Sequence, residues 1–122
     1  MKPKLLIVDD SNVSRMMIRG RIAAMQPEWE LSEAASGDEA VALVPSLRPD
    51  FITMDVNMPG ISGFDAAQQI LQTNPQVRIV MLTANIQSSS RDKAQQLSVK
   101  FVQKPVTQTS MQQAIDYFLG AP

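Results

Sequence analysis

Neither cysteine nor histidine occurs among the 122 residues of this chain. The absence of both residue types excludes disulfide bonds, thiol nucleophiles, the usual zinc ligand sets and acid–base catalysis by imidazole. Any chemistry in this protein must therefore use carboxylates, hydroxyls, amines and, where a metal takes part, a hard cation.

The chain also lacks a strong excess of charge and a long apolar run. Its 11 lysine and arginine residues nearly balance 12 aspartate and glutamate residues, the net charge is −1, and no basic cluster occurs, so we expect no direct binding to nucleic acid. The apolar stretches are too short to span a bilayer, and residues 1–4 show no signal-peptide pattern. We expect a cytoplasmic protein without membrane insertion, folded as one domain over residues 1–122 with no output domain.

Five short apolar runs alternate with five longer amphipathic stretches. Such runs are typical of parallel strands buried on both faces, and their alternation with helices predicts an α/β fold. The expected architecture is a three-layer α/β/α sandwich around a doubly wound, five-stranded parallel sheet. The expected strands are residues 5–8, 29–34, 51–54, 78–83 and 100–103, of which the second is polar enough for a sheet edge. The expected helices are one that Ser11 or Asn12 caps and that runs to about 25, then 37–47, one that includes 64–71 and ends at 74, one that opens within 88–90, and one that includes 111–118.

The fourth of these helices has the weakest apolar face. Beyond Ala94 and Leu97 it has little to bury, so we expect it to be loosely held. The serines at 88–90 offer possible N-caps, and Ser89 and Asp92 have the spacing of a capping box. The eight methionines of the chain are expected to fill the core rather than to form a binding stripe.

Four of the expected strands lead into residues suited to phosphate chemistry. Asp9 and Asp10 follow the first strand, Asp55 follows the third, Thr83 ends the fourth and Lys104 follows the fifth. The carboxyl ends of parallel strands lie at one edge of the sheet, where open doubly wound folds bind ligands, so we expect these side chains to converge. Taken singly, the acids are better explained as a helix cap for Asp9-Asp10 and as a turn residue for Asp55. Their shared position in the strand pattern favours a site.

Three carboxylates in one crevice would repel each other unless a cation lies among them. Oxygen ligands from a few carboxylates, completed by water and phosphate, are typical of Mg²⁺ rather than Ca²⁺. A carboxylate can attack phosphorus, and we assign this role to Asp55, with the metal held by Asp9 and Asp10. Lys104 would pair with the acceptor and phosphoryl oxygens, and the Thr83 hydroxyl would donate a hydrogen bond to the phosphoryl group.

These residues resemble the motifs of receiver domains in bacterial two-component response regulators. The resemblance covers the whole chain, is close to the stand-alone, chemotaxis-type (CheY-like) regulators in length, and implies the flavodoxin-like strand order 2-1-3-4-5. It also implies a cis peptide bond between Lys104 and Pro105. The motifs that carry it are Asp9-Asp10, Asp55 followed by Asn57-Met58-Pro59 and Gly63, Thr83-Ala84, and Lys104-Pro105.

The resemblance further implies a phosphoprotein of phosphorelay signal transduction. Asp55 would accept a phosphoryl group from a phosphohistidine on a histidine kinase or a histidine phosphotransfer protein, with Mg²⁺ or Mn²⁺ as the cofactor. Asp10 would bind the metal directly, Asp9 through water and Asn57 through its backbone carbonyl, and Asp55 would belong to the same metal site.

A switch is implied as well. In the family this switch couples Thr83 to an aromatic residue on the fifth strand, and Phe101 stands at that position here. Plain core packing also explains a phenylalanine at this position. Asn57 and Asn85 occupy the positions that tune the access of water to the acyl phosphate in relatives. Phosphorylation would bias the surface of the fourth helix, fifth strand and fifth helix, which we expect to control the binding of a downstream protein. We expect a monomer or a weak, phosphorylation-dependent dimer.

Other interpretations differ in what they require of the chain. Beyond self-catalysed phosphorylation and dephosphorylation we expect no enzyme. A phosphatase of the haloacid dehalogenase type needs an acid two residues after its nucleophile, where this chain has Ser11 or Asn57. A flavodoxin would need a loop rich in Ser, Thr and Gly in place of the phosphate-repelling Asp9 and Asp10. A phosphorylation-independent scaffold and an intermediate carrier in a phosphorelay remain open.

Overall fold

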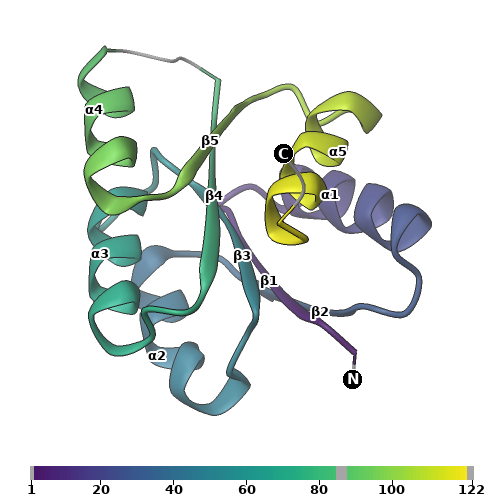
Figure 1. Cartoon of the computed structure of the whole chain (residues 1–122), viewed down its shortest axis with the longest axis horizontal. Helices are drawn as coiled ribbons and strands as arrows, with labels where there is room; N and C mark the ends of the chain where they lie inside the picture. Colours follow the sequence, from purple (N-terminus) through teal and green to yellow (C-terminus); the bar gives the residue numbers. More distant parts are fainter. Residues whose placement is uncertain (1, 85–87, 121–122) are drawn as a thin grey trace.

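The fold is a five-stranded parallel sheet with helices on both faces (Figure 1). The computed structural model describes residues 2–84 and 88–120, and for residues 88–91 the backbone alone. Its elements in chain order are β1 (Lys4–Val8), α1 (Asn12–Met25), β2 (Glu30–Ala34), α2 (Gly37–Leu47), β3 (Phe51–Asp55), α3 (Gly63–Thr73), β4 (Arg78–Thr83), α4 (Ser88–Leu97), β5 (Lys100–Gln103) and α5 (Gln108–Phe118). The strand order is β2-β1-β3-β4-β5. Helices α1 and α5 cover one face of the sheet, and α2, α3 and α4 cover the other (Figure 1).

The predicted sandwich and its strand order are therefore confirmed, but the second strand begins one residue later than predicted. The backbone N–H of Trp29 donates to the carbonyl oxygen of Gln26 at 3.2 Å, so Trp29 belongs to the turn after α1. Strand β2 then starts at Glu30. The Trp29 ring turns into the core, with its centroid 5.1 Å from that of Phe51.

The three inner strands are apolar because helices cover both of their faces. Almost every side chain of β1, β3 and β4 is buried, as expected for parallel strands in the interior of a sheet. Strands β2 and β5 form the edges and carry more exposed side chains. The polar sequence of β2 thus correctly indicated an edge.

Two layers of apolar side chains hold the helices against the sheet, one layer on each face. On the α1 and α5 side this layer includes Ile18, Ile22 and Phe118. The expectation that the methionines fill the core is wrong for Met16 and Met17, which are 69% and 46% exposed. Helix α1 contacts the sheet through Ile18 and Ile22, and positions 16 and 17 lie on other sides of the helix.

Helix α4 buries little. Of its described side chains, Ala94 alone is buried and Leu97 is half-buried, as its weak apolar face predicts. The Tyr117 hydroxyl of α5 donates to the carbonyl oxygen of Ser98, directly after α4, at 3.2 Å. The predicted N-caps and capping box, which require the side chains at 88–90, lie outside the described residues, and the looseness of α4 stays a prediction.

Candidate functional site

The residues at the ends of four strands meet at the carboxyl edge of the sheet. Asp9 follows β1 directly, Asp55 is the last residue of β3 and Thr83 is the last residue of β4. Lys104 follows β5, and its backbone N–H donates to the Thr83 carbonyl oxygen at 2.7 Å. The bond between Lys104 and Pro105 is cis, as the resemblance implied. Because the strands are parallel, residues that are up to 95 positions apart in the chain become neighbours here.

Asp9, Asp10 and Asp55 form a cluster in which one carboxylate oxygen of each lies within 4.8 Å of the others. Asp9 is 1% exposed and Asp55 is 8% exposed, whereas Asp10 is open to solvent. The Lys104 Nζ lies 2.9 Å from Asp9 Oδ2 and 3.7 Å from Asp55 Oδ1. One ammonium group therefore faces three carboxylates, and the cluster is negatively charged when all three are ionised.

Burial raises the pKa of Asp55 from its ordinary value of 3.8 to about 6. The Lys104 charge opposes this shift in the pKa, the charges of Asp9 and Asp10 add to it, and a hydrogen bond from the Asn57 backbone lowers it. A carboxylate with a raised pKa is more basic than usual, yet it stays mostly ionised above neutral pH. Asp55 is therefore suited to act as a nucleophile.

The Asp9 carboxylate is held by three donors. Its Oδ1 accepts from the backbone N–H of Ser11 at 2.9 Å, and its Oδ2 accepts from the Ser14 hydroxyl at 2.7 Å and from Lys104 at 2.9 Å. The Asp9 carbonyl oxygen accepts from Arg15 Nη1 at 2.6 Å. The sequence prediction did not include Ser14 or Arg15. Their place in the first turn of the helix that follows the acidic pair is the signal that could have identified them.

The donor set suits a hard divalent cation. Carboxylate oxygens from three residues converge, and a cation among them would relieve the repulsion that helps to raise the pKa of Asp55. The exposure of Asp10 leaves one side of the cluster open to water, which Mg²⁺ usually retains as part of its coordination. Asn57, two residues after β3, is exposed near the same edge.

The predicted switch residues lie on adjacent strands. Thr83 is 1% exposed at the end of β4. Phe101 on β5 is in register with Met81, two residues before Thr83, and is half-buried with its ring centroid 6.4 Å from that of Phe64 in α3. Asn85 lies outside the described residues. The structure thus places Phe101 against the face of the sheet that α3 and α4 cover, and its role as a switch stays a prediction.

Gly63 allows α3 to begin directly beside the end of β3. A Cβ atom at this position would lie 2.1 Å from the carbonyl oxygen of Asp55, which is closer than any side chain tolerates. The Gly63 backbone N–H donates to the Val56 carbonyl oxygen at 3.0 Å. A glycine is therefore required for steric reasons, because it lets the chain return close to Asp55. Its hydrogen bond to Val56 holds that end of the strand in place.

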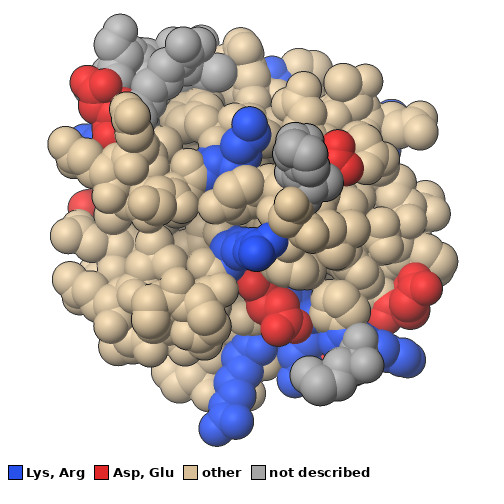
Figure 2. Space-filling model, viewed as in Figure 1, with Lys and Arg blue, Asp and Glu red and all other residues tan. Residues whose placement is uncertain are grey.

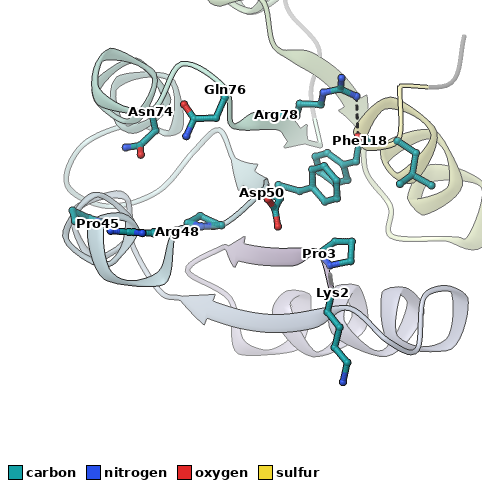
Figure 3. Close-up of a pocket in the computed structure, with 12 residues that line it drawn as sticks. Lys2, Pro3, Pro45, Arg48, Asp50, Asn74, Gln76, Arg78 and Phe118 are labelled. Carbon is teal, nitrogen blue, oxygen red and sulfur yellow. Dashed lines mark hydrogen bonds between the residues drawn. The ribbon is translucent and has the colours of Figure 1, made fainter.

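A hollow of about 820 Å³ lies at the opposite, amino edge of the sheet (Figure 3). Its lining includes Asp50 and Arg78 at the starts of β3 and β4, and Phe118 near the end of α5. In Figure 3, Arg78 reaches the Phe118 carbonyl oxygen, to which its Nη1 donates at 2.9 Å, while Lys2 extends away from the other labelled side chains. Because these charged groups do not converge, the carboxyl edge is the candidate site.

The described surface in Figure 2 carries Lys and Arg side chains that are interspersed with acidic and uncharged ones. The absence of direct nucleic-acid binding stays a prediction. Among the described helices, none is both long and apolar enough to cross a membrane.

Comparison with known proteins gives matches over nearly the whole chain. The family model for the response regulator receiver domain matches residues 5–116. Over 118 residues the chain is 35% identical to protein CcdB of Bacillus subtilis, covering 96% of this chain and 98% of that protein. It is 33% identical over 118 residues to chemotaxis protein CheY of Thermotoga maritima, covering 95% and 97%. The structure of chemotaxis protein CheY4 of Vibrio cholerae superposes with a TM-score of 0.86 at 26% identity, covering 97% of this chain and 99% of that one.

Some relatives are much longer than this chain. Protein-glutamate methylesterase/protein-glutamine glutaminase 4 of Geobacter metallireducens is 43% identical over 83 residues, which are 68% of this chain and 24% of that protein. The similarity to such proteins is therefore confined to a part of each of them.

Proposed function

This chain belongs to the response regulator receiver domain family, and we propose that its Asp55 accepts a phosphoryl group from a phosphohistidine on a partner protein. The family implies an interaction with histidine kinases or phosphotransfer proteins and an acidic site for Mg²⁺. The 122 residues contain no histidine, so the donor imidazole would lie outside them.

The environment of Asp55 carries the proposal. Asp55 ends the central strand β3 at 8% exposure, with the Lys104 ammonium 3.7 Å from its Oδ1 and the carboxylates of Asp9 and Asp10 beside it. With a pKa of about 6, its carboxylate is largely ionised at neutral pH and more nucleophilic than an ordinary aspartate.

In the proposed step, a carboxylate oxygen of Asp55 attacks the phosphorus atom of the donor. A P–O bond forms to give an acyl phosphate, and the P–N bond to the donor imidazole breaks, with the electron pair of that bond leaving on the imidazole. Lys104 pairs with the phosphoryl oxygens, and the Thr83 hydroxyl donates a hydrogen bond to one of them. Each of these side chains stands at the end of a different strand.

We assign the metal to the same edge of the sheet. Asp9, Asp10 and Asp55, together with the backbone carbonyl of Asn57, would hold Mg²⁺ or Mn²⁺. A bound ion of this kind supplies neutralisation of the negative charge on the phosphoryl oxygens. The clustering of the three carboxylates supports this assignment.

The output of the proposed reaction is a change in the surface formed by α4, β5 and α5. Among the described side chains of α4, Ala94 alone is buried, and we propose that a modest free-energy change at the site shifts this helix between two arrangements. We propose that this shift, relayed by Thr83 and Phe101, controls the binding of a downstream protein in the cytoplasm. The chain then acts as a signalling protein rather than as an enzyme on an external substrate.

Intact mass after incubation with acetyl phosphate and Mg²⁺ tests the proposal. We expect the wild type to gain one phosphoryl group, and we expect EDTA and the substitution Asp55→Asn each to abolish the gain. Asp50→Asn is the matched control, because Asp50 stands at the other end of the same strand and its Oδ2 accepts from the Lys4 backbone at 2.9 Å.

Phosphoryl uptake by Asp55→Asn at the wild-type level would contradict the assignment of the acceptor. No uptake by a folded wild type under any condition would contradict the proposed reaction and favour a receiver fold that acts as a scaffold without phosphorylation.

A further inference from the structure

One oxygen of Asp9 is shared between two donors from opposite sides of the site. Asp9 Oδ2 accepts from the Ser14 hydroxyl of α1 at 2.7 Å and from the Lys104 ammonium, beyond β5, at 2.9 Å. Asp9 is 1% exposed, so water has little access to replace either donor. A buried carboxylate that loses a donor is destabilised strongly, because its charge is then incompletely solvated.

Lys104 has two competing partners. Its Nζ is at hydrogen-bond distance from Asp9 and at 3.7 Å from Asp55, so in this structure the lysine is committed to Asp9. The proposed reaction, however, requires Lys104 to pair with a phosphoryl group on Asp55. Movement of the lysine toward that group removes one of the two donors to Asp9 Oδ2.

Ser14 is placed so that it stays behind when Lys104 moves. Its backbone N–H donates to the Oγ of the N-cap Ser11 at 3.2 Å, so Ser14 lies within the first turn of α1. The neighbouring Arg15 donates to the Asp9 carbonyl oxygen and pairs with Glu33 on β2 at 3.0 Å. The start of α1 is thereby tied to Asp9 through groups that do not include Lys104.

We infer that Ser14 is a positioning residue that keeps Asp9 Oδ2 hydrogen-bonded and so lets Lys104 exchange Asp9 for the phosphoryl group. The inference rests on the proposed function. A hydroxyl suits this role because it supplies a donor without a charge. A cation at position 14 would neutralise Asp9 and compete for it with the metal as well as with Lys104.

The test compares Ser14→Ala with Ser14→Thr, which keeps a hydroxyl, and with Ser11→Ala. Ser11→Ala weakens the same helix start by removing the cap. It keeps the backbone N–H of residue 11, which donates to Asp9 Oδ1. Each variant is checked for folding by circular dichroism. The first readout is the rate of phosphorylation by acetyl phosphate at saturating Mg²⁺. The second is the NMR signal of the Lys104 ammonium in the unphosphorylated, metal-free protein.

For Ser14→Ala we expect the maximal phosphorylation rate to fall about tenfold, the order expected for one hydrogen bond to a charged group, with little change in the acetyl phosphate concentration at half-maximal rate. We expect its Lys104 ammonium to exchange protons with water more slowly, because the lysine is then the one remaining donor to Asp9 Oδ2 among the described residues. Ser14→Thr and Ser11→Ala should both stay within about twofold of the wild-type rate.

A wild-type rate and an unchanged Lys104 signal in Ser14→Ala would overturn the inference. So would an equal loss in Ser11→Ala, since the effect would then belong to the helix start, or a failure of Ser14→Thr to restore the rate. A wild type that takes up no phosphoryl group would instead contradict the proposed function. The Lys104 signal would still decide, without any phosphorylation, whether Ser14 shares Asp9 with the lysine.

Discussion

The two apolar faces of the sheet and its carboxyl edge both bury side chains, but these side chains are opposite in character. On the faces, side chains such as Ile18, Ile115 and Phe118 are at most 1% exposed, and their burial stabilises the fold. At the edge, Asp9 and Asp55 are nearly as buried, but their charges make burial costly. The difference teaches that burial on the faces stabilises the fold, and that this stabilisation offsets the cost of holding like charges close together at the edge.

The largest expected effect comes from removing a side chain of the apolar face. Phe118 is 1% exposed and stacks on Phe51 with ring centroids 4.8 Å apart. We expect Phe118→Ala to lower the free energy of unfolding by about 3–5 kcal/mol, the range for large aromatic truncations in cores. Urea unfolding measures this loss. The adjacent Leu119, which is 56% exposed, is the control, and Leu119→Ala should change stability by less than about 1 kcal/mol. Equal losses of stability in both variants would contradict the view that the buried side chains of the sheet faces stabilise the fold.

Neutralising a carboxylate at the edge is expected to do the opposite. Because the pKa of Asp55 is raised from 3.8 to about 6, the folded protein binds this proton more tightly than the unfolded chain does. Its ionisation therefore destabilises the fold at neutral pH. We expect Asp55→Asn to raise the free energy of unfolding in EDTA by about 1–3 kcal/mol, the order that this rise in the pKa of Asp55 implies. A less stable Asp55→Asn protein at neutral pH would contradict the comparison.

The stabilisation expected for Asp55→Asn should increase with pH. Well below pH 3.8, the ordinary pKa of the group, Asp55 is protonated in both states and imposes no electrostatic penalty. The penalty grows between pH 3.8 and about 6, where the unfolded chain has lost this proton and the folded protein still holds it, and it levels off above that range. The stability difference between Asp55→Asn and the wild type should therefore be small near pH 4 and reach its full value at neutral pH. Urea unfolding of both proteins across this range measures the difference, and a gain that is the same at every pH would not come from ionisation.

The smallest expected effect concerns a polar atom within the apolar face. Thr53, two residues before Asp55, is fully buried, and its Oγ1 has no hydrogen-bond partner among the described residues. We expect Thr53→Val to raise the free energy of unfolding by about 1 kcal/mol, because it removes a buried hydroxyl without a partner. Thermal unfolding of the two proteins measures the change. A loss of stability would show that the hydroxyl is satisfied in solution, and that the face is less purely apolar than its composition indicates.

Much of the fold was predictable from the sequence because its signals are local. The bounds of α2 and β4 match the prediction, since an apolar period and its flanking breakers are read over a few residues. The exposure of Met16 and Met17 was not predictable, because α1 has apolar residues on more than one side and packing decides which side faces the sheet. Trp29 was assigned to a strand on its apolar character, whereas a turn hydrogen bond places it before β2.

The candidate site shows the same division. Its carboxylates, threonine and lysine were identified because each directly ends or follows a predicted strand. Ser14 was missed, since its hydroxyl matters only through a contact with Asp9 that depends on how α1 leaves the end of β1. The steric need for a glycine at position 63 likewise appears only when the backbone of Asp55 lies beside it.

By itself, the sequence determined the alternation of strands and helices and the residues that would stand at the carboxyl edge. Since the 122 residues include no histidine, it also determined that a phosphohistidine donor would have to lie outside them. Only the tertiary structure decided that burial raises the pKa of Asp55, that Lys104 is closer to Asp9 than to Asp55, and that Ser14 shares Asp9 with the lysine. The physical reason is the separation along the chain over which each kind of signal acts. Periodicity acts between residues a few positions apart, whereas burial, charge interactions and side-chain hydrogen bonds depend on distances between distant segments that only the packed chain defines.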